Sequence, residues 1–380
     1  MRVALIRGGL LRSWELANYE LPAGRVDAMA SRTVRLGPPA DRFEVRRLTS
    51  ATDFTTRLGP RAFGAVELLA GSPEYLWGLE RALRGYDIAH AAELVYPFTQ
   101  QAVRARAAGA CRRVVATVME NIPFKPHPNR LIAARAREVA TGVDRFIAVT
   151  EGARLHLRCA GIPDERITVL PMGTDLDAFR PHAGERRPGP LRVLSVARLE
   201  PAKGVEDVVV AAGLLAQRGC AVEVSMVGAG PLAPRLLEIA GRMGIAERVR
   251  VLAVPWEKLP ELHRDQDVFV LDSAPTRWWR EQFGFAVIEA MASGLPVLVG
   301  GSGSLPEVVG RSECLVRPHD PQDLAEALGR LAEDPSLRRR EGQLNRERAV
   351  GHFDRREIAA RLQQIYEQVL SEPAIEARSV

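Results

Sequence analysis

The sequence predicts an α/β protein built from two tandem, doubly wound parallel sheets. Three observations support this fold class. Short β-branched runs alternate with longer amphipathic segments, a stretch rich in Pro, Gly and charge interrupts this rhythm near residue 180, and the rhythm then restarts. Such alternation is typical of βαβ units. A chain of 380 residues, 46% of them hydrophobic, can fill two cores.

The first half of the chain contains one set of expected strands. They are VALI (3–6), FEVRRL (43–48), DIAHA (87–91), RVVATV (113–118), FIAVT (146–150) and ITVLP (167–171). The stretch RPHAGERRPGP (180–190) follows and has the composition of an interdomain linker. These limits predict an N-terminal domain over residues 1–180.

The second half repeats the pattern. Its expected strands are LRVLSVA (191–197), VEVSMVG (222–228), RVRVLAV (248–254), VFVLD (268–272), LPVLVG (295–300) and CLVR (314–317). Helices are expected over 207–219 and 232–244, because both segments have helical spacing and end in Gly. We expect a second domain over 181–354 and a C-terminal helical segment, 355–380, that packs back on the first. Two Rossmann-like domains of this kind are expected to face a central cleft at the carboxyl ends of their strands.

Composition excludes several classes of protein. No window approaches the run of about 18 apolar residues that a membrane span needs, and the N-terminal apolar run is too short for a signal peptide. The 4 cysteines lack CxxC spacing, which argues against a zinc site and for a reducing cytosol. The net charge of +5 is concentrated in residues 1–180, but no nucleic-acid-binding motif accompanies it.

Glu281 and Glu289 belong to the segment EQFGFAVIEAMASGLPVLVGGSGSLPEVV (281–309). Continuous helix would separate the two carboxylates by about 12 Å, too far for an acid/base pair acting on one bond. A helix that begins near Gly284 leaves Glu281 in the preceding loop. The N–H groups of its first turn, around 283–286, suit an anion or an oxygen-rich ligand. We interpret the two carboxylates as contacts to one elongated ligand; the alternative is a loop residue and an exposed helical Glu.

A second feature is ARLEPAKG (197–204), which directly follows an expected strand. Arg198 and Lys203 flank its Pro-containing loop, and Lys203 stands out because the other lysines are Lys125 and Lys258. A guanidinium and an ammonium at this end of a sheet can clamp a diphosphate, each charge-assisted bond contributing roughly 1.5–3 kcal/mol. The alternative is ordinary surface charge.

Taken together, RLEPAKG, VGAGP (227–231) and the segment 281–309 resemble the retaining glycosyltransferases of family 4, which have the two-domain GT-B fold. ITVLPMGTDLDAFRP (167–181) is similar to the segment with which that family leaves its first domain. The resemblance is detailed over residues 145–320 and generic before them. It implies transfer of a sugar from a nucleoside diphosphate donor.

The resemblance also implies roles for individual residues. Arg198 and Lys203 would hold the donor diphosphate, Glu281 would contact the transferred sugar, and Glu289 would contact the ribose. Val254, after the strand RVRVLAV, would border the base.

Backbone groups are implied as further donor contacts. The N–H groups of Phe283, Gly284 and Phe285 would contact the sugar and phosphates. The glycine loop Gly8-Gly9, after the first strand, would lie beside the diphosphate.

The first domain departs from the family pattern. After the strand RVVATV many members carry a His beside the reacting sugar, whereas this chain has Glu120 and Asn121. These two are candidates for the acceptor or sugar pocket, and the alternative is that they merely start a loop. The polar and aromatic loop 10–24 is expected to shape the acceptor pocket, and His90 is expected to be a packed strand residue.

Two other patterns are interpreted as decoys. GAGPLA (228–233) matches the dinucleotide fingerprint G-x-G-x-x-A, but Pro231 restricts the turn and no acidic residue closes the next strand. An NAD-dependent oxidoreductase is therefore less favoured than a sugar transferase. The DxD triplets at 175–177 and 265–267 are interpreted as turn or capping residues, and no essential metal is expected.

The resulting hypothesis is a cytoplasmic, retaining glycosyltransferase that uses a nucleoside diphosphate sugar and needs no cofactor. Its acceptor would be a small molecule, a glycan or a lipid-linked sugar, with peripheral contact to the inner membrane face through the basic first half. No nucleic acid partner and no covalent nucleophile are expected. A two-domain nucleotide-sugar epimerase and a non-catalytic nucleotide-sugar-binding protein remain the alternatives.

Overall fold

The computed structural model describes residues 1–37, 40–59, 64, 66, 72, 74–127, 129–184 and 189–373. The chain folds into two compact units. The first unit comprises Met1–Pro171 and Arg356–Val380, and the second comprises Met172–Arg355. This division falls before the expected linker, of which residues 185–188 lie outside the described residues, as do residues 374–380 of the expected C-terminal segment.

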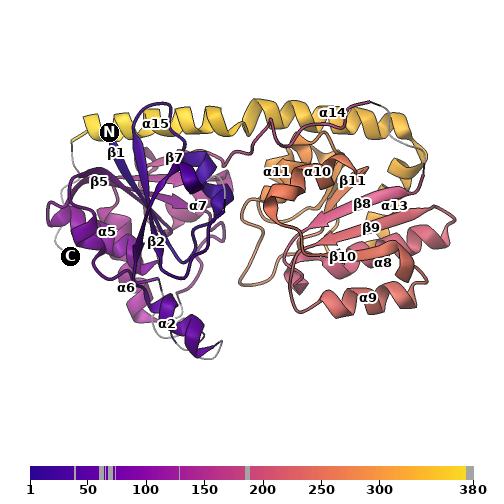
Figure 1. Ribbon diagram of the computed structural model, residues 1–380, viewed down its shortest axis with the longest axis horizontal. Coiled ribbons are helices and arrows are strands. Elements are labelled where there is room, and N and C mark those ends of the chain that lie inside the picture. Colours follow the sequence, from indigo (N-terminus) through magenta and orange to yellow (C-terminus); the bar gives the residue numbers. More distant parts are fainter. Residues whose placement is uncertain are drawn as a thin grey trace. The chain divides into compact units, whose positions relative to one another are not determined.

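The first unit contains a parallel sheet (Figure 1), with the order β3-β2-β1-β4-β5-β6-β7 for the 7 strands that the described residues form. These strands are β1 (Arg2–Gly8), β2 (Arg25–Ser31), β3 (Glu44–Leu48), β4 (Tyr86–Ala92), β5 (Cys111–Val118), β6 (Arg145–Ala148) and β7 (Ile167–Val169). The helices are α1 (Ser13–Leu16), α2 (Ala51–Leu58), α4 (Leu79–Ala82), α5 (Pro97–Ala107), α6 (Arg130–Gly142), α7 (Glu151–Cys159) and α15 (Arg355–Ser371).

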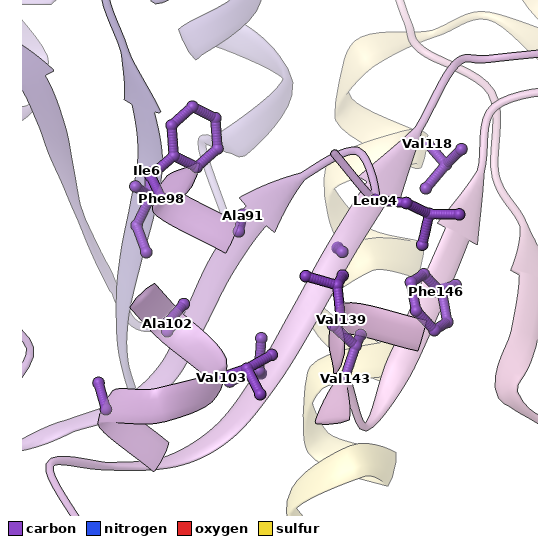
Figure 2. Packing of buried hydrophobic residues seen from close by; sticks show 14 of the residues in the cluster. Ile6, Ala91, Leu94, Phe98, Ala102, Val103, Val118, Val139, Val143 and Phe146 are labelled. Atoms are coloured by element: carbon purple, nitrogen blue, oxygen red, sulfur yellow. The ribbon is translucent and has the colours of Figure 1, made fainter. Parts of the chain in front are cut away.

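Alternate residues of β1 pack on opposite faces of this sheet, as the pleat of a strand requires. Ala4 and Ile6 join a buried cluster with Phe98 of α5 and Val139 of α6. Figure 2 shows these helical side chains on the same side of the sheet as Ile6. On the other face, Val3, Leu5 and their neighbours pack against the C-terminal helix α15. Helices therefore cover both faces of the sheet.

The second unit contains another parallel sheet, with the order β10-β9-β8-β11-β12-β13 for the 6 strands in the described part of the chain. These strands are β8 (Leu191–Val196), β9 (Val222–Val227), β10 (Val249–Leu252), β11 (Val268–Leu271), β12 (Val297–Gly300) and β13 (Leu315–Val316). The helices are α8 (Val205–Gln217), α9 (Ala233–Arg242), α10 (Leu259–Arg264), α11 (Phe285–Ala292), α12 (Leu305–Val309), α13 (Pro321–Glu333) and α14 (Pro335–His352).

The two parallel sheets confirm the predicted α/β class. The core of the second unit lies between its sheet and helices α8 and α13, where Val193 and Val270 of the strands meet Val208 of α8 and Leu328 of α13. Strands buried on both faces are apolar along their whole length. This explains why VFVL, which is buried along its whole length, is readily predicted as a strand.

Candidate functional site

The loops that follow β8 and β11 leave the second sheet side by side. β8 pairs with β9 on one side and with β11 on the other, so the chain changes its direction across the sheet at β8. Ligands of doubly wound sheets bind at the carboxyl ends of the strands at such a switch point. Lys203 lies in the loop after β8, and Glu281 lies in the loop between β11 and α11.

Lys203 and Glu281 form an ion pair at this switch point. Lys203 Nζ lies 2.7 Å from Glu281 Oε2, and the side chains are only 13% and 9% exposed. The hydroxyl of Ser273 donates to the same carboxylate oxygen at 2.6 Å. The N–H of Ser304 donates to the backbone carbonyl of Glu281 at 2.9 Å, so the loop after β12 also fixes this residue. The structure therefore brings Lys203, one of the two residues expected at the diphosphate, together with Glu281, the residue expected at the sugar.

Helix α11 begins at Phe285 with Gly284 as its N-cap, which confirms the predicted helix start. Gly284 has φ 91° and ψ 59°, a conformation that residues with a Cβ rarely adopt. An added Cβ would also lie 2.8 Å from Leu305 Cδ2. The ring of Phe283 is buried, with its centroid 5.1 Å from that of Phe285, so this side chain is not available to a ligand.

Glu289 lies on α11 and is buried, with 8% of its surface exposed. The alternative interpretation of an exposed helical Glu is therefore wrong. The indole N–H of Trp256 donates to Glu289 Oε1 at 2.9 Å. Burial raises the pKa of Glu289 to about 7, and the Trp256 hydrogen bond opposes this rise. Val254, the predicted neighbour of the base, is half-buried in the same loop as Trp256, after β10.

Arg198 differs from Lys203 in its surroundings. It is exposed and pairs with Glu200, 2.6 Å from Arg198 Nη1 to Glu200 Oε2. Its neighbour Leu199 is bonded to the loop 227–231, because the Leu199 N–H donates to the Ala229 carbonyl at 3.0 Å. The structure thus joins the two loop motifs RLEPAKG and VGAGP, but it does not place Arg198 in the Lys203–Glu281 pair. Its contact to a diphosphate stays a prediction.

Sequence reasoning missed three partners at this site: Trp256, Ser273 and Trp279. Lys203 Nζ lies 4.6 Å from the centroid of the Trp279 ring, within cation–π range. A signal for Trp279 was available, because two of the 5 tryptophans stand together just before Glu281. Ser273 and Trp256 carried no such signal, since they meet their carboxylates only through the fold.

The glycine loop of the first unit is hydrogen-bonded to a carboxyl group of the same unit. The Gly9 N–H donates to Glu74 Oε2 at 2.6 Å, and the Thr52 hydroxyl donates to Glu74 Oε1 at 2.8 Å. Burial raises the pKa of the Glu74 carboxyl. The carboxyl group of Glu74 therefore occupies the turn at which a donor phosphate was expected. The contact of Gly8 and Gly9 to a donor stays a prediction.

Glu120 and Asn121 begin the loop after β5. Glu120 Oε1 accepts the N–H groups of Asn121 and Ile122 at 3.1 and 3.0 Å, and Glu120 Oε2 lies 2.5 Å from Lys125 Nζ. Glu120 thus organises its own loop, which is the simpler of the two interpretations of this residue. Nearby, Glu93 accepts the N–H of Met119 at 2.7 Å, and burial raises its pKa to about 7.

The segment 10–24 is not a loop along its whole length, and its expected role in shaping the acceptor pocket stays a prediction. Residues 13–19 form helical turns, and Leu16 and Tyr19 belong to the buried cluster on the α15 face of the sheet. Buried Glu15 pairs with Arg7 at 2.6 Å, so its charge is met inside the unit. His90 is a fully buried strand residue, as predicted.

The DxD triplets have structural roles. Asp175 Oδ1 accepts the N–H groups of Asp177 and Ala178, and Asp267 pairs with Arg192 at 2.9 Å. Within the described residues, no group of three or more His, Cys, Asp or Glu is arranged to hold a metal ion. Nor does that part of the chain include a helix with the length and apolar character needed to cross a bilayer.

In a comparison with known families, two family models match successive parts of the chain. Residues 180–348 match the model of the glycosyl transferases group 1, and residues 34–178 match the model of glycosyltransferase family 4. The chain is 37% identical over 237 residues to the D-inositol 3-phosphate glycosyltransferase of Nocardia farcinica, which covers 57% of this chain and 50% of that protein. The chain thus spans about half the length of that curated relative.

A relative covered more fully is the GDP-mannose-dependent alpha-(1-6)-phosphatidylinositol monomannoside mannosyltransferase of Mycolicibacterium smegmatis. It is 30% identical over 275 residues, which are 69% of this chain and 71% of the relative.

Solved structures agree on the fold. Anabaena HepE in complex with UDP has a TM-score of 0.74 at 19% identity, covering 98% of this chain and 100% of that one. Sucrose-phosphate synthase from Thermosynechococcus elongatus has a TM-score of 0.69 at 20% identity, covering 97% and 99%. The two family models, the mannosyltransferase relative and the two parallel sheets lead to one conclusion: this chain belongs to the group 1, family 4 glycosyltransferases.

Proposed function

We propose that the protein is a retaining glycosyltransferase that moves a sugar from a nucleoside diphosphate donor to an acceptor hydroxyl. The observation that carries the proposal is the buried Lys203–Glu281 ion pair at the switch point of the second sheet. Two residues 78 positions apart are held there with opposite charges. A polar pair of this kind suits a ligand that has a diphosphate at one end and sugar hydroxyls at the other.

In the proposed reaction, positive charge develops on the sugar ring and negative charge on the leaving diphosphate. Lys203, Arg198 and the N–H groups at the start of α11 would stabilise the diphosphate. Glu281 would turn from Lys203 to the sugar hydroxyls, and Glu289 would accept the ribose hydroxyls. No metal ion is part of this mechanism, because cationic side chains and backbone N–H groups balance the developing charge.

The acceptor is proposed at a coarser level. The relatives named above act on D-inositol 3-phosphate and on phosphatidylinositol monomannoside. We propose an acceptor of the same broad chemistry, a polyol or sugar that is free or lipid-linked. For a lipid-linked acceptor the basic excess of residues 1–180 would favour an anionic membrane surface on the cytoplasmic side. The acceptor contacts of Glu120 and Asn121 belong to the same proposal.

Substitutions at the ion pair test the donor assignment. Lys203→Met and Glu281→Gln should each lower kcat by roughly 10²-fold or more, the usual loss when one stabiliser of transition-state charge is removed. The measurement is release of nucleoside diphosphate from a nucleotide-sugar panel, with and without acceptors. Lys258→Ala is the matched control, because Lys258 is an exposed lysine of the same unit.

Two results would contradict the proposal. If both variants keep turnover within about threefold of the wild-type value, the ion pair is not the donor site. If the wild-type protein converts the donor sugar with no acceptor present and releases no nucleoside diphosphate, the reaction is an epimerisation.

A further inference from the structure

The loop between β11 and α11 forms a hydrogen-bonded turn just before Glu281. The N–H groups of Trp278 and Trp279 donate to the hydroxyl of Thr276 at 3.2 and 2.9 Å. The Thr276 N–H donates back to the Trp279 carbonyl at 2.8 Å. A side-chain hydroxyl that organises its own turn in this way fixes the backbone of the residues that follow. The backbone at Trp279 is therefore fixed by the turn, and its ring lies against Lys203.

The Trp279 ring faces the ammonium of Lys203. The distance from Lys203 Nζ to the ring centroid is 4.6 Å, and the distance from Nζ to Glu281 Oε2 is 2.7 Å. The ammonium is thus in contact with both an aromatic face and a carboxylate. Both come from one loop, two residues apart, while Lys203 comes from the neighbouring strand's loop.

The two partners of Lys203 have different consequences for an anionic ligand. A carboxylate neutralises the ammonium and uses one of its three N–H donors. An aromatic face attracts the cation through its quadrupole, but it neither neutralises the charge nor accepts a strong hydrogen bond. A lysine whose flexible stem is held by a ring therefore keeps its charge and its N–H groups available for a phosphate oxygen.

We propose that Trp279 is a positioning residue for the donor diphosphate, acting through Lys203. When Glu281 turns to the sugar, Trp279 holds the ammonium of Lys203 at the place where the phosphate oxygens bind. This inference rests on the proposed function and adds to it a residue that sets affinity for the diphosphate part of the donor. The nucleoside part is bound elsewhere and is independent of Trp279.

The chain offers a matched control in the adjacent residue. Trp278 is 54% exposed, and its ring contacts the guanidinium of Arg277, with 4.8 Å from Cζ to the ring centroid. Trp278→Leu removes an indole of the same turn without touching the Lys203 contact. Trp279→Leu removes the ring face but keeps apolar volume, and Trp279→Phe keeps a ring face.

The experiment measures binding of GDP, UDP, guanosine and uridine to the full-length protein by calorimetry, with thermal unfolding as a check on folding. Trp279→Leu should weaken binding of the preferred nucleoside diphosphate by roughly 3- to 30-fold, the range for a cation–π contact. Binding of the matching nucleoside should not change. Trp278→Leu should leave both affinities at the wild-type level, and Trp279→Phe should recover most of the loss. In a Lys203→Met background, Trp279→Leu should have no further effect.

Several outcomes would overturn the inference. If Trp279→Leu and Trp278→Leu change the affinities equally, Trp279 has no positioning role. The same conclusion follows if Trp279→Leu weakens nucleoside and nucleoside diphosphate binding equally, because a general distortion of the loop produces that result. A full Trp279→Leu effect in the Lys203→Met background would show that the ring acts on something else. Failure of the wild-type protein to bind any nucleoside diphosphate is a separate result, which overturns the proposed function itself and this inference with it.

Discussion

At the scale of single residues, the protonation of Glu289 links donor binding to pH. Burial raises the pKa of this carboxyl to about 7 in the ligand-free protein. Ribose hydroxyls donate hydrogen bonds, so the ionised form of Glu289 is the better acceptor for them. Binding of the donor should therefore lower the pKa of Glu289 and release a proton below pH 7.

The sign of the effect follows from this linkage. As the pH rises toward 7, the affinity for a nucleoside, which carries no phosphate that titrates in this range, should increase by as much as roughly tenfold per pH unit, and above pH 7 it should level off. Calorimetry at pH 6 in buffers of different ionisation enthalpy should show a proton released on binding. Glu289→Gln should abolish both the release and the pH dependence. A variant that retains them would show that another group titrates, such as buried Asp272, whose pKa is also raised to about 7.

The sequence around Glu281 and Glu289 was enough to place one carboxylate before a helix and one within it. That reasoning needed only helix geometry and the position of Gly284. The partners of these carboxylates could not be predicted from local sequence. Lys203 and Trp256 reach them from loops that follow other strands, and such pairings are fixed by strand order, which here places β11 beside β8.

At the scale of elements, the start of α11 depends on Gly284. Its backbone has φ 91°, and an added Cβ would lie 2.8 Å from Leu305 Cδ2. Gly284→Ala should therefore lower the free energy of unfolding by about 1–3 kcal/mol, through backbone strain and the clash. Gly241 is the matched control, because it lies exposed in α9 with no atom near an added Cβ.

Equilibrium unfolding in urea measures both variants. Gly241→Ala should raise the free energy of unfolding by about 0.5–1 kcal/mol, since alanine is the better helix former. Opposite signs at the two glycines are the expected result. A neutral or stabilising Gly284→Ala would mean that α11 can begin without the left-handed residue, and that the N–H groups at its start are not fixed by the turn.

Strand β2 shows where prediction of elements failed. Its sequence, RVDAMAS, contains two charged residues and one β-branched residue, so it lacks the composition typical of a strand. Asp27 is fully buried there, but it accepts hydrogen bonds from Tyr86 at 2.6 Å and from Arg25 at 2.7 Å, and it pairs with Arg2 at 3.1 Å. A buried charge is tolerated when it is paired. Its partners come from β1, β2 and β4, so composition alone could not identify the strand.

At the scale of the whole molecule, the last helix of the described chain packs against the first strand. Helix α15 carries Leu362, Tyr366 and other apolar residues into the cluster that contains Val3 and Leu5 of the first strand. Tyr366 also hydrogen-bonds to buried His90 of β4. The last helix therefore completes the core of the first unit, although the second unit separates the two segments in sequence.

Leu362→Ala tests whether helix α15 stabilises the first unit and not the second. Removing a buried leucine side chain should lower the free energy of unfolding of the first unit by about 2–5 kcal/mol. Hydrogen–deuterium exchange read by mass spectrometry reports each unit separately, and peptides from β1, β4 and β5 should exchange faster. Gln364→Ala, an exposed change on the same helix, is the control and should have no measurable effect.

Binding provides the second half of this test. Lys203, Glu281 and Glu289 belong to the second unit, so the affinity of the Leu362→Ala variant for a nucleoside diphosphate should stay within about threefold of the wild-type value. Turnover of this variant should fall only at temperatures at which the first unit unfolds. If exchange instead accelerates equally in peptides from both units, they unfold together, and the last helix supports the whole chain rather than the first unit.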